Sequence, residues 1–166
     1  MSYNQTPDEI FPLLVRAVGE NLNCDRVFLY LRNPQTQTGT VPYCWCRNSK
    51  YPDVTTGEWK KEPESLAQED PLFAAALRTE PSIFVEDVET ANPAIVNKDF
   101  EAKAFGHRAL IHAHLCSDGL LWGVLQPCVF HRPRVWTGVD RELIAAVTDK
   151  IVPLAVAYVT WATPEI

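Results

Sequence analysis

Positive charge is scarce in this sequence. Fifteen lysines and arginines face 21 aspartates and glutamates, which gives a net charge of -6, and the basic residues form no cluster. A surface that follows the phosphates of DNA or RNA needs such a cluster, so nucleic acid is not expected as a partner. The five cysteines are odd in number and scattered, which fits reduced thiols better than a disulfide framework.

The sequence also shows no signal-peptide pattern and no long apolar run. No early segment places basic residues before an apolar run, and no uninterrupted apolar run approaches the roughly 20 residues that span a bilayer. We therefore expect a cytoplasmic protein without a membrane span. The 166 residues, 46% of them hydrophobic, suit a single domain over residues 1–166 with a core of about 7–161.

Helices are predicted at both ends of the chain. The signal Thr6-Pro7-Asp8-Glu9 is typical of a capping box and begins a helix that runs to about residue 23. Its apolar residues recur at spacings of three and four, which predicts one buried stripe: Ile10, Leu13, Leu14, Ala17, Val18 and Leu22. The last helix is predicted over about 139–160, with Thr137 as its N-cap and a bend at Pro153.

The strands between these helices are predicted mostly as hairpins. One hairpin pairs residues 26–31 with 40–46, and a second pairs 109–116 with 120–130 across the turn Ser117-Asp118-Gly119. A fifth strand is expected over 82–87, with short helices near 70–79 and 97–105 and a long loop over 51–64. This order favours an α+β fold: a central antiparallel sheet, the terminal helices on one face, and loops and short helices forming a pocket on the other.

Several motifs resemble one family. They are Leu121-Trp122-Gly123 followed by Val124-Leu125, Pro133-Arg134-Val135-Trp136, Cys24-Asp25-Arg26-Val27, Asp70-Pro71-Leu72-Phe73, Val85-Glu86-Asp87-Val88 and Arg108-Ala109-Leu110. On these motifs nearly the whole chain resembles a GAF domain, in particular the bilin-binding GAF domains of phytochromes and cyanobacteriochromes. The resemblance implies a GAF-like fold, a cyanobacterial origin, and a polar contact between Asp70 and the pyrrole nitrogens of a bilin.

The sequence departs from that family where the bilin is attached. Asn97 stands at the position of the attaching cysteine, and Lys98 at that of the following histidine or tyrosine. Leu72 replaces the second cysteine that some members use, and Cys128 replaces the histidine that follows the Leu-Trp-Gly motif. We therefore expect no covalent bilin by the usual route, while a noncovalent tetrapyrrole stays open as a cofactor.

Eight residues are candidates for a ligand pocket: Trp59, Asp70, Phe73, Asn97, Phe100, Arg108, His112 and Cys128. A purely structural role competes with each assignment. Asp70 and Asn97 both stand where a helix N-cap is expected, and aromatic residues at such spacings belong more often to a core than to a pocket.

The sequence gives little indication of a metal site or a catalytic site. Cys44 and Cys46 share one strand face, as do His112 and His114, but a zinc site typically uses Cys-x-x-Cys knuckles. His107 follows Gly106 and could belong to a loop near a thiol, but no aspartate or asparagine that would orient it and no oxyanion loop is identifiable. We expect no metal site and no catalytic residue.

The function expected from the sequence is that of a non-enzymatic, stand-alone GAF module in signal transduction, which binds a small molecule or a partner protein. Large aromatic side chains slightly favour a filled pocket and a partner protein, and apolar residues on several sides of the last helix suggest a homodimer through the terminal helices. Two alternatives stay open. One is a photosensory or carrier protein with a noncovalent bilin. The other is a free methionine sulfoxide reductase of the GAF type, although its motifs are not recognisable around Cys44 and Cys46.

Overall fold

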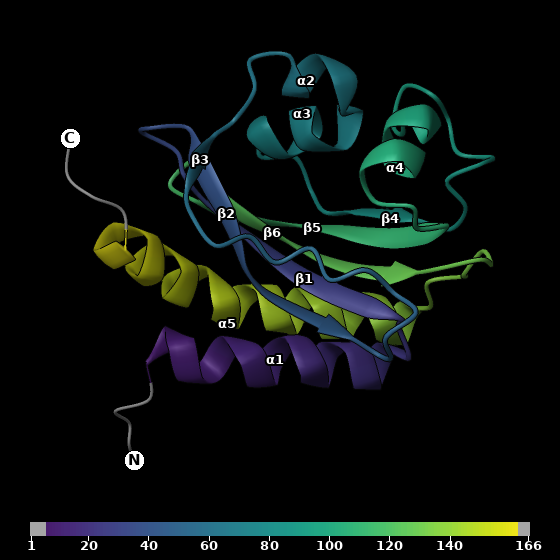
Figure 1. The fold of residues 1–166 in the computed structure, drawn as a ribbon, viewed down its shortest axis with the longest axis horizontal. Coiled ribbons are helices and arrows are strands. Elements are labelled where there is room, and N and C mark those ends of the chain that lie inside the picture. The colour runs from purple at the N-terminus through teal and green to yellow at the C-terminus, as the bar shows by residue number, and fades with distance from the viewer. Residues whose placement is uncertain (1–5, 163–166) are drawn as a thin grey trace.

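A six-stranded antiparallel sheet forms the centre of the protein, which a computed structural model describes for residues 6–162 (Figure 1). The strand order is β3-β2-β1-β6-β5-β4. The elements are α1 (Pro7–Leu22), β1 (Arg26–Asn33), β2 (Thr38–Cys46), β3 (Lys60–Lys61), α2 (Leu66–Glu69), α3 (Pro71–Leu77), β4 (Ile83–Val85), α4 (Lys98–Ala104), β5 (Ala109–Ser117), β6 (Leu120–Val129) and α5 (Gly138–Ala162). This arrangement confirms the predicted α+β class and both predicted hairpins.

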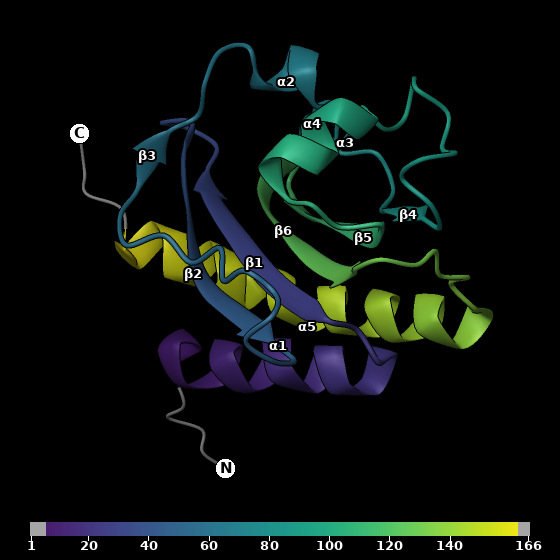
Figure 2. The same ribbon diagram turned by 45° about the vertical axis from the view of Figure 1, so that its right-hand side comes forward.

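The helices divide between the two faces of the sheet. The terminal helices α1 and α5 lie side by side on one face, and the short helices α2, α3 and α4 lie on the other (Figures 1 and 2). The main core fills the space between the sheet and the terminal helices, with Phe11, Leu29, Ile111, Leu125 and Ile151 all fully buried. The other face carries smaller apolar clusters, and the elements there are short, which leaves room for cavities.

The predicted stripe of α1 is confirmed in part: Val18 and Leu22 are buried, but its other members are not. The helix buries Phe11, Val15, Val18, Gly19 and Leu22, a set with the expected helical spacing, whereas Leu13 of the predicted stripe is 64% exposed. The Phe11 ring points inward and packs against the rings of Tyr43 and Tyr158. The N-terminus also differs from the prediction, because the Thr6 side chain forms no capping hydrogen bond.

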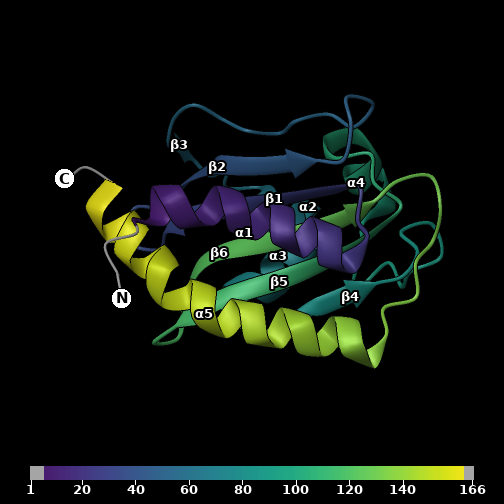
Figure 3. The same ribbon diagram turned by 90° about the horizontal axis from the view of Figure 1, so that it is seen from below.

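Helix α5 begins as predicted. The backbone N–H of Asp140 donates to Thr137 Oγ1 (3.2 Å), and the backbone N–H of Thr137 donates to Asp140 Oδ2 (2.9 Å), so the two residues cap the helix reciprocally. The helix changes direction in its C-terminal half, which contains Pro153 (Figure 3).

The apolar character of α5 bears on the expectation of no membrane span. By length and composition, Gly138–Ala162 is a helix that can cross a membrane, and only 22% of its most apolar window is buried. Those criteria also fit a helix that covers a core, and Ile144, Ile151, Ala155 and Val159 are buried against the sheet. The helix therefore covers the sheet with one side and exposes apolar residues on others.

The segment between β6 and α5 is fastened to β4. The indole N–H of Trp136 donates to the carbonyl of Val85 (3.0 Å), and the backbone N–H of Arg134 donates to the carbonyl of Glu86 (2.9 Å). Trp136 is 3% exposed and belongs to the main core. The Pro-Arg-Val-Trp motif thus fixes the chain as it crosses from the sheet to the last helix.

Candidate functional site

A cavity of about 390 Å³ lies on the face of the sheet opposite to α1 and α5. We call it the aromatic cavity. It is lined by Phe28, Tyr30, Gly39, Thr40, Val41, Thr56, Lys60, Lys61, Glu62, Pro63, Leu66, Asp70, Phe73, Phe100, Phe105, Val124 and Gln126. Strands β1, β2 and β6 form its floor, and the segment through β3, together with α3 and α4, forms its walls.

The pleat of the strands explains this lining. Successive side chains of a strand point to opposite faces. Phe28 and Tyr30 of β1 therefore face the cavity, whereas Leu29 between them is fully buried in the main core. Val124 and Gln126 of β6 face the cavity by the same alternation.

Aromatic rings give the cavity flat walls. Phe28 and Phe105 stack with ring centroids 5.7 Å apart and planes 17° apart. Phe100 meets Phe105 edge to face at 6.2 Å, and Phe73 meets Tyr30 in the same manner at 6.4 Å. A flat apolar molecule can pack against such rings with favourable stacking geometry.

Asp70 places one carboxyl group in these apolar surroundings. It is 6% exposed, and it caps α3 by accepting a hydrogen bond from the backbone N–H of Leu72 (3.1 Å). Burial raises the pKa of Asp70 to about 7, with a further contribution from Glu101 and an opposing one from the backbone N–H groups of Phe73 and Leu72. Near neutral pH, Asp70 can therefore offer either a proton or a negative charge to a ligand.

An ion pair holds the outer wall in place. Arg32 of β1 binds Glu62 through Nη2 (2.6 Å) and Nε (2.8 Å), and the Tyr30 hydroxyl also contacts this carboxylate. Both side chains of the ion pair are buried, with exposures of 5% and 9%. The strand β3 adds backbone pairing to β2 at the same edge. The wall is therefore attached to the sheet through charged and backbone contacts.

The structure places three of the eight predicted pocket residues in the aromatic cavity, namely Asp70, Phe73 and Phe100. Asn97 lies outside it and acts as the N-cap of α4: its Oδ1 accepts from the backbone N–H of Phe100 (3.2 Å), and its Nδ2 donates to the carbonyl of Glu69 (2.9 Å). Trp59 also lies outside, because it packs against the main core.

The other three predicted residues are separate from this cavity and from one another. Arg108 forms ion pairs with Asp87 (2.7 Å) and Glu89 (3.3 Å). His112 is buried and bonds through Nδ1 to Nε2 of His114 (2.8 Å). Burial lowers the pKa of both imidazoles, which favours their neutral forms.

Cys128 takes part in a buried chain of polar groups whose acidic member, Glu101, the sequence did not suggest. Its Sγ lies 3.2 Å from Nδ1 of His107, whose Nε2 lies 2.7 Å from Oε1 of Glu101. Burial raises the pKa of Glu101 to about 7. The thiol is fully buried and lies outside the cavities described here, so this chain joins α4 to the sheet. Its members are 6 and 21 positions apart, and no local motif signals their contact.

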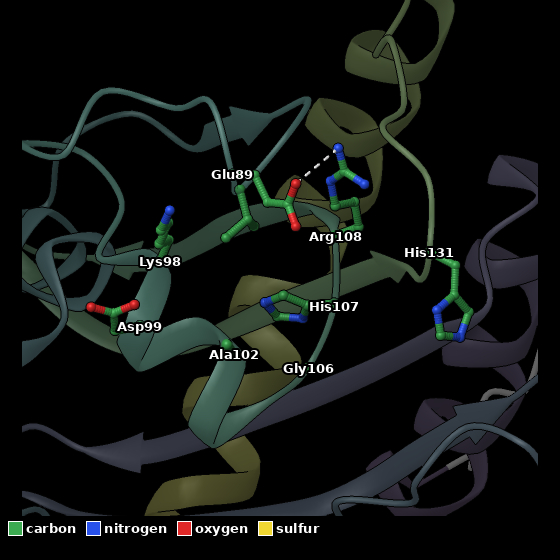
Figure 4. A pocket seen from close by; sticks show the side chains of 9 residues that line it. Glu89, Lys98, Asp99, Ala102, Gly106, His107, Arg108 and His131 are labelled. Atoms are coloured by element: carbon green, nitrogen blue, oxygen red, sulfur yellow. Dashed lines mark ion pairs between the residues drawn. The ribbon is translucent and has the colours of Figure 1, made fainter.

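A second hollow, of about 550 Å³, lies on the other side of α4 (Figure 4). Lys98 and Asp99 project from the helix toward it, and Arg108 and Glu89 form an ion pair at its rim (Figure 4). The side chains that line this hollow include both acidic and basic groups. The aromatic cavity is the better ligand site, because apolar walls with a few convergent polar groups are the usual composition of such sites.

The cysteine pair on β2 and the histidine pair on β5 are too far apart to share a metal ion. Cys44 and Cys46 lie on β2, and His112 and His114 lie on β5, with β1 and β6 between these strands. Within residues 6–162, no three His, Cys, Asp or Glu side chains are placed to hold a metal ion together.

Comparison with known proteins identifies the family of this chain, and solved structures with a similar fold agree with it. A model of the GAF domain family matches residues 6–152. The chain is similar to the solved GAF3 domain from Slr1393 of Synechocystis sp. PCC6803 in its photoproduct state (24% identity, 93% of this chain, 94% of that one, TM-score 0.69). It is also similar to the GAF domain of an Acinetobacter phosphoenolpyruvate-protein phosphotransferase (10% identity, 98% of this chain, 89% of that one, TM-score 0.71).

A third similar structure is that of JSC1_58120g3 in its far-red absorbing dark state, with bound biliverdin IXα (15% identity, 93% of this chain, 90% of that one, TM-score 0.68). Other similar chains are GAF domains of cyanobacteriochromes. No protein of curated function matches the chain.

Proposed function

We propose, from the premise that this chain belongs to the GAF domain family, that it is a regulatory module that holds a small molecule noncovalently in the aromatic cavity. The observation that carries this proposal is the placement of the Asp70 carboxyl inside a cavity with aromatic walls. Its volume of about 390 Å³ lies within the range of about 300–1,000 Å³ that is typical of ligand pockets.

The chemistry of the lining supports binding rather than catalysis. Among the described residues, no cysteine lines the cavity, so no thiol is available there for a covalent bond or for sulfoxide reduction. The threonine hydroxyls bond to each other, with Thr40 Oγ1 3.0 Å from Thr56 Oγ1, and the Tyr30 hydroxyl contacts Glu62. A ligand that shifts α3, α4 or the wall attached by Glu62 would change the surface offered to a partner.

A variant that fills the cavity tests this proposal. Val124 is 2% exposed and lines the cavity, so Val124→Phe adds a ring to the space that the ligand would occupy. Leu120→Phe is the matched control, because Leu120 is 42% exposed on the same strand. We expect small molecules extracted from denatured wild-type protein and the control to include one compound that is missing from Val124→Phe. Identical extracts from all three proteins would contradict the proposal.

A tetrapyrrole is the second candidate ligand. Asp70 could accept hydrogen bonds from pyrrole N–H groups, and a structure with a similar fold contains biliverdin IXα. The cavity is at the lower end of the usual size, so a molecule with four rings would need the wall through β3 to move outward. The test is a titration with biliverdin IXα followed by denaturation in acidic urea. Visible absorbance that leaves the chain on denaturation supports this candidate, and no absorbance change on titration would rule it out.

The terminal helices support a further proposal, in which a second copy of this chain is the partner. Leu13 of α1 is 64% exposed and Trp161 of α5 is 80% exposed, and most of the apolar window of α5 is not buried. Pairing these helices across a two-fold axis would cover the exposed apolar residues. Sedimentation equilibrium should then give a dimer for the wild type and a monomer for Leu13→Glu. A wild-type monomer at all concentrations would contradict this proposal.

A further inference from the structure

The outward face of β2 carries two thiols at a spacing that suits a metal ion. Cys44 and Cys46 are two positions apart on the strand, so their side chains point to the same face, and their Sγ atoms are 3.9 Å apart. Both residues are free and half-buried, beneath the loop that follows β2. This pair lies outside the aromatic cavity, and the inference below does not rest on the proposed function.

The distance favours a bridging metal over a disulfide. Two thiolates bound to one metal at about 2.3 Å have sulfurs about 3.8 Å apart at a tetrahedral angle and about 4.6 Å apart when linear. A disulfide needs its sulfurs about 2.05 Å apart and its Cα atoms within about 6.8 Å. Two positions along an extended strand span about 6.7 Å, at the limit of that range. A disulfide here would strain β2, whereas a two-coordinate metal ion needs the sulfurs to separate by at most about 0.7 Å from the observed 3.9 Å, which side-chain rotation can supply without movement of the strand.

The ligand set selects the kind of metal. Within the described residues, no third or fourth His, Cys, Asp or Glu completes a site, so a metal that demands four ligands, as structural zinc does, is poorly served. Thiolates are soft ligands, and Cu(I) is the soft first-row cation that binds them well and accepts two-fold coordination. The pair is therefore suited to a monovalent, thiophilic ion.

A buried arginine balances the charge of such a complex. Arg26 of β1 stands directly opposite Cys46 in the strand register and is fully buried. The Arg26 Nη1 donates to the carbonyl of Pro52 (3.1 Å), and Cys46 Sγ lies 3.8 Å from the same oxygen. The Nε of Arg26 is the single buried side-chain nitrogen or oxygen without a hydrogen-bond partner in the described part of the chain. The positive charge of Arg26 thus lies opposite Cys46 and acts on its thiol, while Arg26 Nη2 also lies 3.9 Å from Cys128 Sγ.

We propose that Cys44 and Cys46 form a two-coordinate site for Cu(I). Binding exchanges two S–H protons for two copper–sulfur bonds: one Cu(I) and two thiols give a bis-thiolate complex with a net charge of -1 and release two protons to solvent. No electron is transferred. The Arg26 guanidinium offsets the charge of -1, while the carboxylate of Asp53, which lies beside Cys44, is exposed and screened by water.

The test is a copper competition with the reduced, full-length protein under anaerobic conditions. Cu(I) is supplied as its coloured bicinchoninate complex, and loss of colour measures transfer to the protein. We expect one Cu(I) per chain for the wild type and for Cys116→Ser, the control, whose thiol is also half-buried but unpaired with another cysteine. Cys44→Ser and Cys46→Ser should each bind about 100-fold more weakly or worse, because each leaves a single sulfur.

Two further measurements keep the result interpretable. Circular dichroism of the apo variants checks that each serine protein is folded, and copper-edge X-ray absorption of the wild type should show two sulfur neighbours. Release of two protons per copper in unbuffered solution is expected as well. The proposal is overturned if the wild type takes no copper from the chelator, if the Cys44→Ser and Cys46→Ser proteins keep wild-type affinity, or if the spectrum shows only nitrogen and oxygen neighbours.

Discussion

Replacing Asp70 with asparagine removes a charge from the aromatic cavity and keeps an oxygen that can cap α3. The wild-type carboxyl has a pKa of about 7 in the folded protein, because it is buried and lies near Glu101. In the unfolded chain its pKa returns to about 3.9. Between these values the folded state binds more protons than the unfolded state, so this group makes the protein less stable as pH rises from about 4 to about 7.

The size of the effect follows from the two pKa values. Relative to a group that stays neutral in both states, Asp70 lowers the free energy of unfolding by about 1.5 kcal/mol at pH 5, where it is ionised in the unfolded chain and neutral in the folded one, and by about 4 kcal/mol at pH 8. Asparagine does not ionise, so the gain in stability from Asp70→Asn should be about 2.5 kcal/mol larger at pH 8 than at pH 5. In urea this corresponds to an additional rise in the unfolding midpoint of about 1 M.

The assay is urea unfolding followed by circular dichroism at the two pH values. Asp149→Asn serves as the control, because Asp149 is exposed on α5, and its substitution should change stability by less than about 0.5 kcal/mol at either pH. An equal midpoint shift for Asp70→Asn at pH 5 and pH 8 would refute the reasoning, since it would mean that the carboxyl is solvated like any surface group.

Three other substitutions test the packing of the main core and of the cavity wall by urea unfolding. Gly19→Ala should destabilise the protein by about 1–3 kcal/mol, because a Cβ there would lie 2.2 Å from the ring of Trp45; unchanged or higher stability would contradict this. Glu62→Ala should cost about 3–5 kcal/mol by leaving Arg32 buried without its partner, and a cost below 1 kcal/mol would mean that the wall is solvated. Trp136→Phe should cost about 1–2 kcal/mol through loss of the hydrogen bond to β4, and a neutral result would count against that role.

The exposed pair Arg16 and Glu20 provides the matched control for Glu62→Ala. Its side chains are 64% and 54% exposed, so water already solvates both charges. Glu20→Ala should therefore change stability by less than about 1 kcal/mol. An effect as large as that of Glu62→Ala would show that burial does not explain the difference.

Local patterns predicted most of the fold. The apolar runs over β1, β5 and β6 and the capping signal at Thr137 depend on neighbours in the chain, and the structure contains all of them. The inward face of α1 was predicted only in part: Val18 and Leu22 are buried as expected, but apolar residues lie on both sides of the true stripe, and only packing against the sheet selects Phe11 over Leu13.

The site was predicted less completely than the fold. Asp70 was predicted from the resemblance of Asp70-Pro71-Leu72-Phe73 to a motif of bilin-binding GAF domains, and the structure places it both in the aromatic cavity and at the N-cap of α3. Trp59 could not be placed, since a loop residue has no periodicity that reveals its direction. The contact between Glu101, His107 and Cys128 depends on how α4 sits over β6, which is a property of the whole fold.

The intact mass of the protein tests the central claim most directly. Wild-type chain, purified without denaturation, would be weighed by mass spectrometry under native conditions and again after denaturation. Retention of a small molecule in the aromatic cavity predicts an added mass that is present in the native spectrum, absent after denaturation, and absent from native Val124→Phe. A native mass equal to that of the bare chain, or an added mass that Val124→Phe keeps, would contradict the account.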